Sequence, residues 1–211
     1  MQTAFKHNNY NLLAPFYDFL AGSIFGQKLK LAQNIFLSSI PLNSKVLVIG
    51  GGTGIFLPEL IKRTQRIHFV DHSEKMVQLA KQRIRWFSPE MVFLTADVLE
   101  APAASYDAII TFFFFDQFKM EKALALRAFL DTRTHAQTVW LVSDFCIKST
   151  TSPFHKFLLQ LMYWFFQRIA HLETDQLPDI AALMQQGGWY ASQYHEIRKD
   201  FIFASVWRRN A

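Results

Sequence analysis

The chain has 211 residues, 51% of them hydrophobic and 22 of them phenylalanine, which fits a single domain with a full-sized core. Its formal net charge is +5, but the basic residues are scattered in short groups. That pattern argues against a nucleic-acid-binding surface and leaves acidic small substrates or peripheral membrane contact open. The single cysteine, Cys146, excludes an intramolecular disulfide, and the first residues lack the pattern of a secretory signal, so we expect a cytoplasmic protein.

The first 44 residues are predicted to be mostly helical. Residues 10–18 begin a first helical region, in which Phe16 and Tyr17 belong to one apolar face. A second amphipathic helix is predicted over residues 29–40, because Pro41 does not favour its continuation. Ordinary helical packing is the simplest interpretation of this segment.

An apolar run that ends in a cluster of glycines follows. Val46–Ile49 has no polar alternation, which predicts a buried parallel strand. The glycines permit a tight turn and close approach of the backbone to a ligand, and a helix is predicted to begin near Pro58. A dinucleotide-binding fingerprint would need its third glycine at Ile55, so a nicotinamide-dependent reductase is disfavoured. A loop that binds nothing remains the alternative for these glycines: Gly50, Gly51, Gly52 and Gly54.

A second strand is predicted over Ile67–Asp71, with Asp71 at its carboxyl end. A carboxylate at this distance from the glycine loop is suited to accept hydrogen bonds from both ribose hydroxyls of an adenosine. An aspartate in such a place is often only a helix cap. Ser73 is the better cap for the helix predicted over residues 75–85, which leaves Asp71 for the ribose.

Two further strands are predicted before the middle of the chain. Met91–Thr95 is the third strand, and Asp97 follows it either as a ligand-binding side chain or as a turn residue. Tyr106–Thr111 is the fourth, followed by four successive phenylalanines at 112–115 that cannot all point to one side of a strand. Asp116 is either the N-cap of a helix through residue 130 or a base near a substrate, and the cap is the favoured interpretation.

The last third of the chain contains two helices and three strands. The fifth strand is predicted over residues 138–145 and carries Asp144 near its end. The helix of residues 154–171 is apolar and aromatic apart from a narrow polar stripe, so we expect it to be buried or to contact lipid or a partner. A helix over residues 177–186 and an antiparallel hairpin of residues 190–197 and 201–207 complete the sheet.

Four of these segments resemble motifs of class I S-adenosylmethionine-dependent methyltransferases. The segments are Val46–Gly54, Val70–Met76, Ala96–Val98 and Tyr106–Thr111. The resemblance implies an α/β fold: a Rossmann-like, seven-stranded, mostly parallel sheet with helices on both faces, a C-terminal antiparallel hairpin and an N-terminal helical lid. Val48 departs from the family, which usually has an acidic residue there to hold the loop and the methionine amino group.

The N-terminal segment is similar to that of the ubiquinone and menaquinone biosynthesis methyltransferases. Tyr17 and Asp18 match that pattern, and Tyr10 is a plausible lid residue. The segment after the predicted fourth strand differs from the sequence pattern of this branch at Phe114, Asp116 and Gln117. This difference argues against the same substrate.

The resemblance implies S-adenosylmethionine as the cofactor and a set of residues that would bind it. The expected cofactor-binding residues are Tyr17, Gly50, Gly51, Gly52, Thr53, Gly54, Asp71, His72, Met76, Ala96, Asp97, Val98 and Phe112. The catalytic residue is not identified, and Asp116 and Tyr17 are the weak candidates. We expect no metal, because the histidines lack metal-ligand spacing.

We therefore predict one methyltransferase domain over residues 1–211. Residues 1–44 would form the lid segment, 45–146 the cofactor-binding core, and 147–211 the substrate-side helices and the hairpin. The expected reaction is methyl transfer to a small, hydrophobic, aromatic or quinone-like acceptor, without nucleic acid. A degenerate, non-catalytic binding partner remains the main alternative, and a nicotinamide-dependent reductase is the lesser one.

Overall fold

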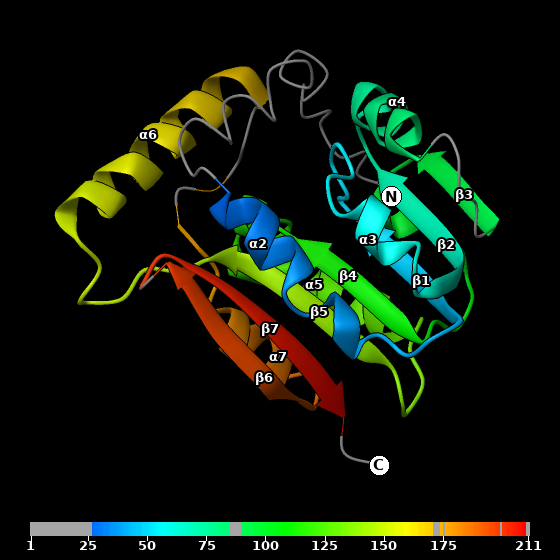
Figure 1. Cartoon of the computed structure of the whole chain (residues 1–211). Helices are drawn as coiled ribbons and strands as arrows, with labels where there is room; N and C mark the ends of the chain where they lie inside the picture. Colours follow the sequence, from blue (N-terminus) through cyan, green and yellow to red (C-terminus); the bar gives the residue numbers. More distant parts are fainter. Residues whose placement is uncertain (1–26, 85–89, 171–173, 175, 199, 210–211) are drawn as a thin grey trace, which may run out of the picture.

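A seven-stranded sheet forms the centre of the protein (Figure 1). The computed structural model describes residues 27–84, 90–170, 174, 176–198 and 200–209. The strand order is β3-β2-β1-β4-β5-β7-β6, and β7 is antiparallel to both of its neighbours while the other pairs are parallel. This confirms the predicted Rossmann-like sheet. The strands are β1 (Ser44–Ile49), β2 (Thr64–Asp71), β3 (Glu90–Thr95), β4 (Ala108–Phe112), β5 (Val139–Phe145), β6 (Trp189–Arg198) and β7 (Ile202–Arg209).

Helices cover both faces of the sheet, because alternate residues of the central strands are apolar toward each side. In β1, Val46 and Val48 join one core cluster, and Leu47 and Ile49 join the other. The first cluster includes residues from α2 (Lys28–Asn34), α3 (Leu57–Leu60) and α4 (Glu74–Arg83), and the second from α5 (Met120–Asp131) and α7 (Ile180–Gln185). Each fully buried aliphatic side chain contributes about 1.5–3 kcal/mol to this core.

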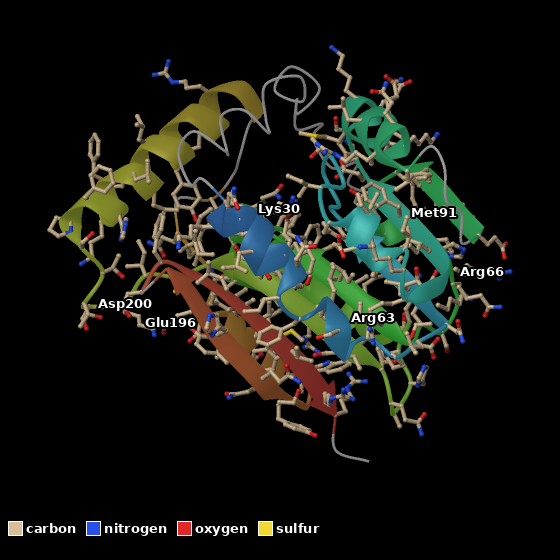
Figure 2. The ribbon with its side chains drawn as sticks, viewed as in Figure 1. Lys30, Arg63, Arg66, Met91, Glu196 and Asp200 are labelled. Carbon is tan, nitrogen blue, oxygen red and sulfur yellow. The ribbon has the colours of Figure 1, made fainter. Side chains whose placement is uncertain are left out.

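Two predicted helices are shorter than expected. The helix after the glycine loop, α3, is a single turn, and β2 begins already at Thr64. The helix predicted over residues 29–40 ends at Asn34 and is followed by a separate 3-10 turn, η2 (Leu37–Ser39). Arg63 fixes this arrangement, because its guanidinium donates hydrogen bonds to the carbonyls of Ser38 (3.1 Å) and Ile40 (3.2 Å) (Figure 2).

The long aromatic helix, α6 (Pro153–Ala170), is only partly buried. Leu159 and Tyr163 join the first core cluster, whereas Phe154 and Phe157 are more than 60% exposed. The hairpin end beside this helix is fastened by Lys148, which forms ion pairs with Glu196 and Asp200 (Figure 2).

Some of the predictions lie outside the described residues. They concern the first 26 residues of the predicted lid segment, with Tyr10, Tyr17 and Asp18. Within the part of the chain that the structure describes, no helix has the length and apolarity needed to cross a membrane.

Candidate functional site

The glycine loop lies at the carboxyl end of β1 and contains one glycine with open space above it. A Cβ on Gly51 would lie 2.2 Å from the Phe69 ring, so this glycine is required by packing. Gly52 has a φ of +56°, and a Cβ built there would meet no atom within 4 Å. The backbone of Gly52 is therefore the part of the loop that a ligand can approach most closely.

Asp71 holds this loop from the end of the neighbouring strand. Its Oδ2 accepts a hydrogen bond from the Gly52 amide at 2.8 Å, and its Oδ1 accepts one from the Ser73 amide at 2.9 Å. Although the residue is partly exposed, burial of its carboxyl raises the pKa of Asp71, and the two amides oppose that shift. Each carboxylate oxygen can accept a second bond, so the ribose role stays a prediction.

The helix that follows Asp71 begins as predicted. The Ser73 hydroxyl accepts a hydrogen bond from the Met76 amide at 3.3 Å and caps α4. Met76 is buried in the first turn of that helix, and His72 is half-buried between the strand and the helix. Ser73, and not Asp71, is therefore the N-cap of this helix.

The last turn of α4 supplies a contact that sequence reasoning missed. Arg83 Nε donates to the Thr53 carbonyl at 2.7 Å, thirty residues away along the chain. Nothing in the helical pattern distinguishes Arg83 from the other basic residues of this segment, because the contact depends on how α4 packs beside the loop. Asp71 and Arg83 thus hold the loop at two successive residues, Gly52 and Thr53.

Two of the expected cofactor-binding residues, Ala96 and Asp97, follow the end of β3, beside Asp71. The Ala96 amide donates to the Asp71 carbonyl at 3.1 Å. Asp97 Oδ1 accepts from the Leu99 amide at 2.9 Å and caps the 3-10 turn η3 (Val98–Glu100). The structure therefore brings Gly52, Asp71 and Ala96 together at one edge of the sheet, where ligands of α/β proteins bind.

Val48 occupies the place where an acidic residue was expected. It is fully buried and pairs in register with Phe69 and Ile110. The space beneath the loop is therefore apolar, and a carboxylate there would lose its hydration. The contact of Asp71 with Gly52 supplies a carboxylate to the loop from the side instead.

The four successive phenylalanines divide between the two faces of the sheet. Phe112 and Phe113 join the first core cluster, and Phe114 and Phe115 join the second. Phe112 packs edge-on against Phe56, with ring centroids 5.0 Å apart. Phe114 lies against Gly50, where its Cδ2 is 2.7 Å from the position a Cβ would take.

Asp116 does not cap the following helix, so the favoured interpretation is wrong. It lies in the 3-10 turn η4 (Phe115–Gln117), and α5 begins only at Met120, with Lys119 at the cap position. This turn is separate from α5 because Phe113 has a φ of +51° and because the Phe113 carbonyl accepts a hydrogen bond from Gln117 Nε2 at 2.9 Å. This geometry carries Asp116 over the end of β5.

Asp116 and Asp144 form a pair of enclosed carboxyl groups there. The Asp116 amide donates to Asp144 Oδ2 at 3.3 Å, and the Phe145 amide donates to Asp144 Oδ1 at 2.8 Å. Asp116 Oδ1 is buried without a hydrogen-bond partner. Burial raises the pKa of Asp116 to about 7; burial and then the negative charge of Asp116 raise the pKa of Asp144 well above its ordinary value.

The arrangement offers polar groups and glycines rather than metal ligands. Among the described residues, no three His, Cys, Asp or Glu side chains are placed to hold a metal ion. The chemistry available is hydrogen bonding at the ends of β1 to β3 and a carboxyl pair at the ends of β4 and β5.

Comparison with known proteins agrees with this geometry. Residues 46–132 match a family model described as a methyltransferase domain. Carboxy-S-adenosyl-L-methionine synthase of Nautilia profundicola is 26% identical over 170 residues, which make up 78% of this chain and 68% of the synthase.

Solved structures share the fold over almost the whole length. A complex of DhpI with SAH has a TM-score of 0.70 at 15% identity, covering 96% of this chain and 94% of that one. Magnesium protoporphyrin IX methyltransferase from Synechocystis PCC 6803, with bound SAH, has a TM-score of 0.65 at 15% identity, covering 94% and 99%. The similarity to the quinone-biosynthesis branch stays a prediction.

Proposed function

We propose that the chain is a class I S-adenosylmethionine-dependent methyltransferase that transfers a methyl group to a small acceptor with a flat, apolar body. The methyltransferase-domain match over residues 46–132 and the shared fold support this proposal. The observation that carries the proposal is the loop geometry. Gly52 is open to close approach, and Asp71 lies beside it with both oxygens able to accept another bond.

The residues of the site fit S-adenosylmethionine. A side chain at residue 52 would fill the open space over the loop, and the Asp71 carboxylate stands at the strand end where a ribose is bound in related folds. The cofactor, when bound, supplies a reactive methyl group, so orientation and exclusion of water can provide most of the rate. The names of the two structures include SAH, the demethylated product of this compound, and the name of the synthase includes a carboxylated derivative of it, which supports the same class of ligand here.

The nature of the acceptor is inferred from what surrounds the end of β4. Phe114 packs against Gly50 of the glycine loop, Phe112 packs against Phe56, and Tyr163 of α6 donates its hydroxyl to the Asp116 carbonyl at 3.4 Å. Aromatic walls of this kind gain roughly 25 cal/mol for each Å² of apolar ligand surface removed from water. A sugar-like acceptor would gain little from them.

The acceptor proposal is tested by transfer of a labelled methyl group from S-adenosylmethionine across a panel of phenols, quinols and polar acceptors. We expect products with the phenols and quinols, and a changed preference in Phe114→Ala and Tyr163→Ala. Transfer confined to polar acceptors would reject a flat, apolar acceptor. A large loss of thermal stability without any change of preference would show that both residues serve only the packing of the core.

The main alternative, a non-catalytic binding protein, rests on Val48. The contact of Asp71 with the Gly52 amide weighs against it, because the loop retains a carboxylate partner. The same panel separates the two, since a non-catalytic protein would yield no methylated product from any acceptor.

A further inference from the structure

We propose that Asp116 and Asp144 form an acceptor site that binds a hydroxyl or amino group and takes its proton during methyl transfer. The inference rests on the proposed function and deepens it, because it specifies a polar group that the acceptor must carry on its apolar body. In this arrangement Asp116 contacts the acceptor, and Asp144 is a positioning residue behind it.

The two carboxyls have unequal hydrogen bonding. Both oxygens of Asp144 accept backbone amides, one from Asp116 and one from Phe145. Asp116 Oδ1 has no partner although it is buried. A buried polar atom without a hydrogen bond costs about 1–3 kcal/mol, so its retention calls for a function or a ligand. A hydroxyl or amino group of the acceptor is a donor that would satisfy this oxygen.

The pair lies where an acceptor would have to stand. Phe114, two residues before Asp116, lies against Gly50 of the cofactor loop, and β4 is the neighbour of β1 in the sheet. On the far side, Tyr163 connects α6 to the Asp116 carbonyl. The carboxyl pair therefore lies at the same carboxyl end of the sheet as the proposed methyl donor, at the ends of β4 and β5.

The charges around the two carboxyls favour a methyl acceptor that can donate a proton over one that is negatively charged. The charged group that acts on Asp144 is Asp116, and among the described residues no cation contributes to the pKa of either carboxyl. Cys146, which follows Asp144 closely, is neutral because burial raises the pKa of its thiol to about 11. Lys148 is engaged by Glu196 and Asp200. Two adjacent enclosed carboxyls then share one proton near neutral pH and titrate as a pair.

The proposed step balances without a further reactant. The acceptor O–H or N–H proton moves to the Asp116 carboxylate as the lone pair of that oxygen or nitrogen forms the new bond to the methyl carbon. The S–CH₃ bond breaks with its electron pair staying on sulfur, which yields S-adenosylhomocysteine. The proton then leaves to solvent. A base of this kind typically contributes a factor of 10²–10⁴ to the rate when its pKa is close to the working pH.

The test compares two aromatic probes of which only one can donate a hydrogen bond, while the other carries a methyl group on each oxygen. Catechol and 1,2-dimethoxybenzene are titrated by calorimetry into the protein saturated with S-adenosylhomocysteine, between pH 5.5 and 8.5. We expect the wild-type protein to prefer catechol by about tenfold or more, since the dimethoxy probe cannot satisfy the buried carboxylate. The preference should grow as the pH rises through the titration of the pair.

Two variants separate the roles of the carboxyls. Asp116→Asn should lose the preference for catechol. Asp144→Asn should keep a preference that still grows as the pH rises through about 7, because burial of Asp116, which raises the pKa of its carboxyl to about 7, is retained. Asp131→Asn is the matched control, since it removes a partly buried carboxyl at the end of α5 that is bound by Arg127 of the same helix and by Arg209 of β7. It should behave as the wild-type protein toward both probes.

A wild-type protein that binds both probes alike, or neither, would overturn the proposal, and so would a preference that survives in Asp116→Asn. In that case the proton shared by the two carboxyls would affect the stability of the folded protein and would have no role in acceptor binding. A separate titration with S-adenosylhomocysteine alone reports on the proposed function. Its failure would reject methyl transfer, whereas its success with no probe preference would reject only the carboxyl site.

Discussion

At the scale of single residues, Asp71 connects the glycine loop to the end of β2 and the start of α4. One carboxylate oxygen holds the Gly52 amide and the other holds the Ser73 amide. These bonds explain how the loop keeps a carboxylate partner although β1 carries Val48 in place of an acid. Asp71 therefore has a structural task in the free protein and, by our proposal, a second task toward the ribose.

Replacing Asp71 with alanine should weaken binding of S-adenosylhomocysteine by roughly a hundredfold or more, because two hydrogen bonds to the ribose would be lost. Such charged hydrogen bonds are worth about 1.5–3 kcal/mol each. Calorimetric titration measures the affinity. Asp179→Ala is the matched control, because Asp179 also accepts a backbone amide at 3.0 Å but caps α7. Unchanged affinity in a folded Asp71→Ala protein would show that the ribose is bound elsewhere.

Replacing Gly52 with alanine should abolish most of the cofactor affinity. The added methyl group would occupy the open space through which a ligand approaches. Gly188→Ala provides the control, since Gly188 also has a positive φ, +75°, and open space around it, but lies between α7 and β6. Both variants should lose about 1–2 kcal/mol of stability through left-handed strain. If affinity falls equally in both, or in neither, Gly52 has no special role.

At the scale of elements, the strands were predictable and the turns between them were not. The apolar runs of β1, β4 and β5 predict their burial, and the structure confirms them. The helix cap at Ser73 was also predictable, because the hydroxyl and the helical pattern lie close together in the sequence. Such features depend on neighbours along the chain.

Asp116 shows why the rest was not predictable. Its position depends on the positive φ of Phe113 and on the contact of Gln117 with the Phe113 carbonyl, and neither can be inferred from an aspartate before a helix. Its pairing with Asp144 joins residues from two different strand ends. Likewise, Arg83 reaches Thr53 only because α4 packs beside the loop. Contacts between distant elements decide the site, and the sequence contains no local signal for them.

At the scale of the whole molecule, the buried carboxyls of Asp116 and Asp144 make the stability of the folded protein depend on pH. The pKa of Asp116 is raised from its ordinary value of 3.8 to about 7 in the folded protein. The stability that its protonated form contributes is fully present below about pH 4 and is lost as the pH rises through about 7. Asparagine at this position would not titrate.

We therefore expect Asp116→Asn to gain stability relative to the wild-type protein as the pH rises from 4.5 to 8. Thermal unfolding over this pH range measures the difference, and for a chain of this size about 1 kcal/mol corresponds to roughly 2–4 °C. Asp131→Asn should instead lose stability at neutral pH, because its carboxylate is bound to two arginines. A constant difference between Asp116→Asn and the wild-type protein at all pH values would contradict the raised pKa.

The most direct test of the account is a calorimetric titration of the wild-type protein with S-adenosylmethionine, S-adenosylhomocysteine and NADH. The open backbone at Gly52, the carboxylate at Asp71 and the absence of a glycine at residue 55 all favour the first two ligands. We predict saturable binding of S-adenosylmethionine and S-adenosylhomocysteine at one site, with no binding of NADH. Binding of NADH without either of the other ligands would contradict the assignment of the loop.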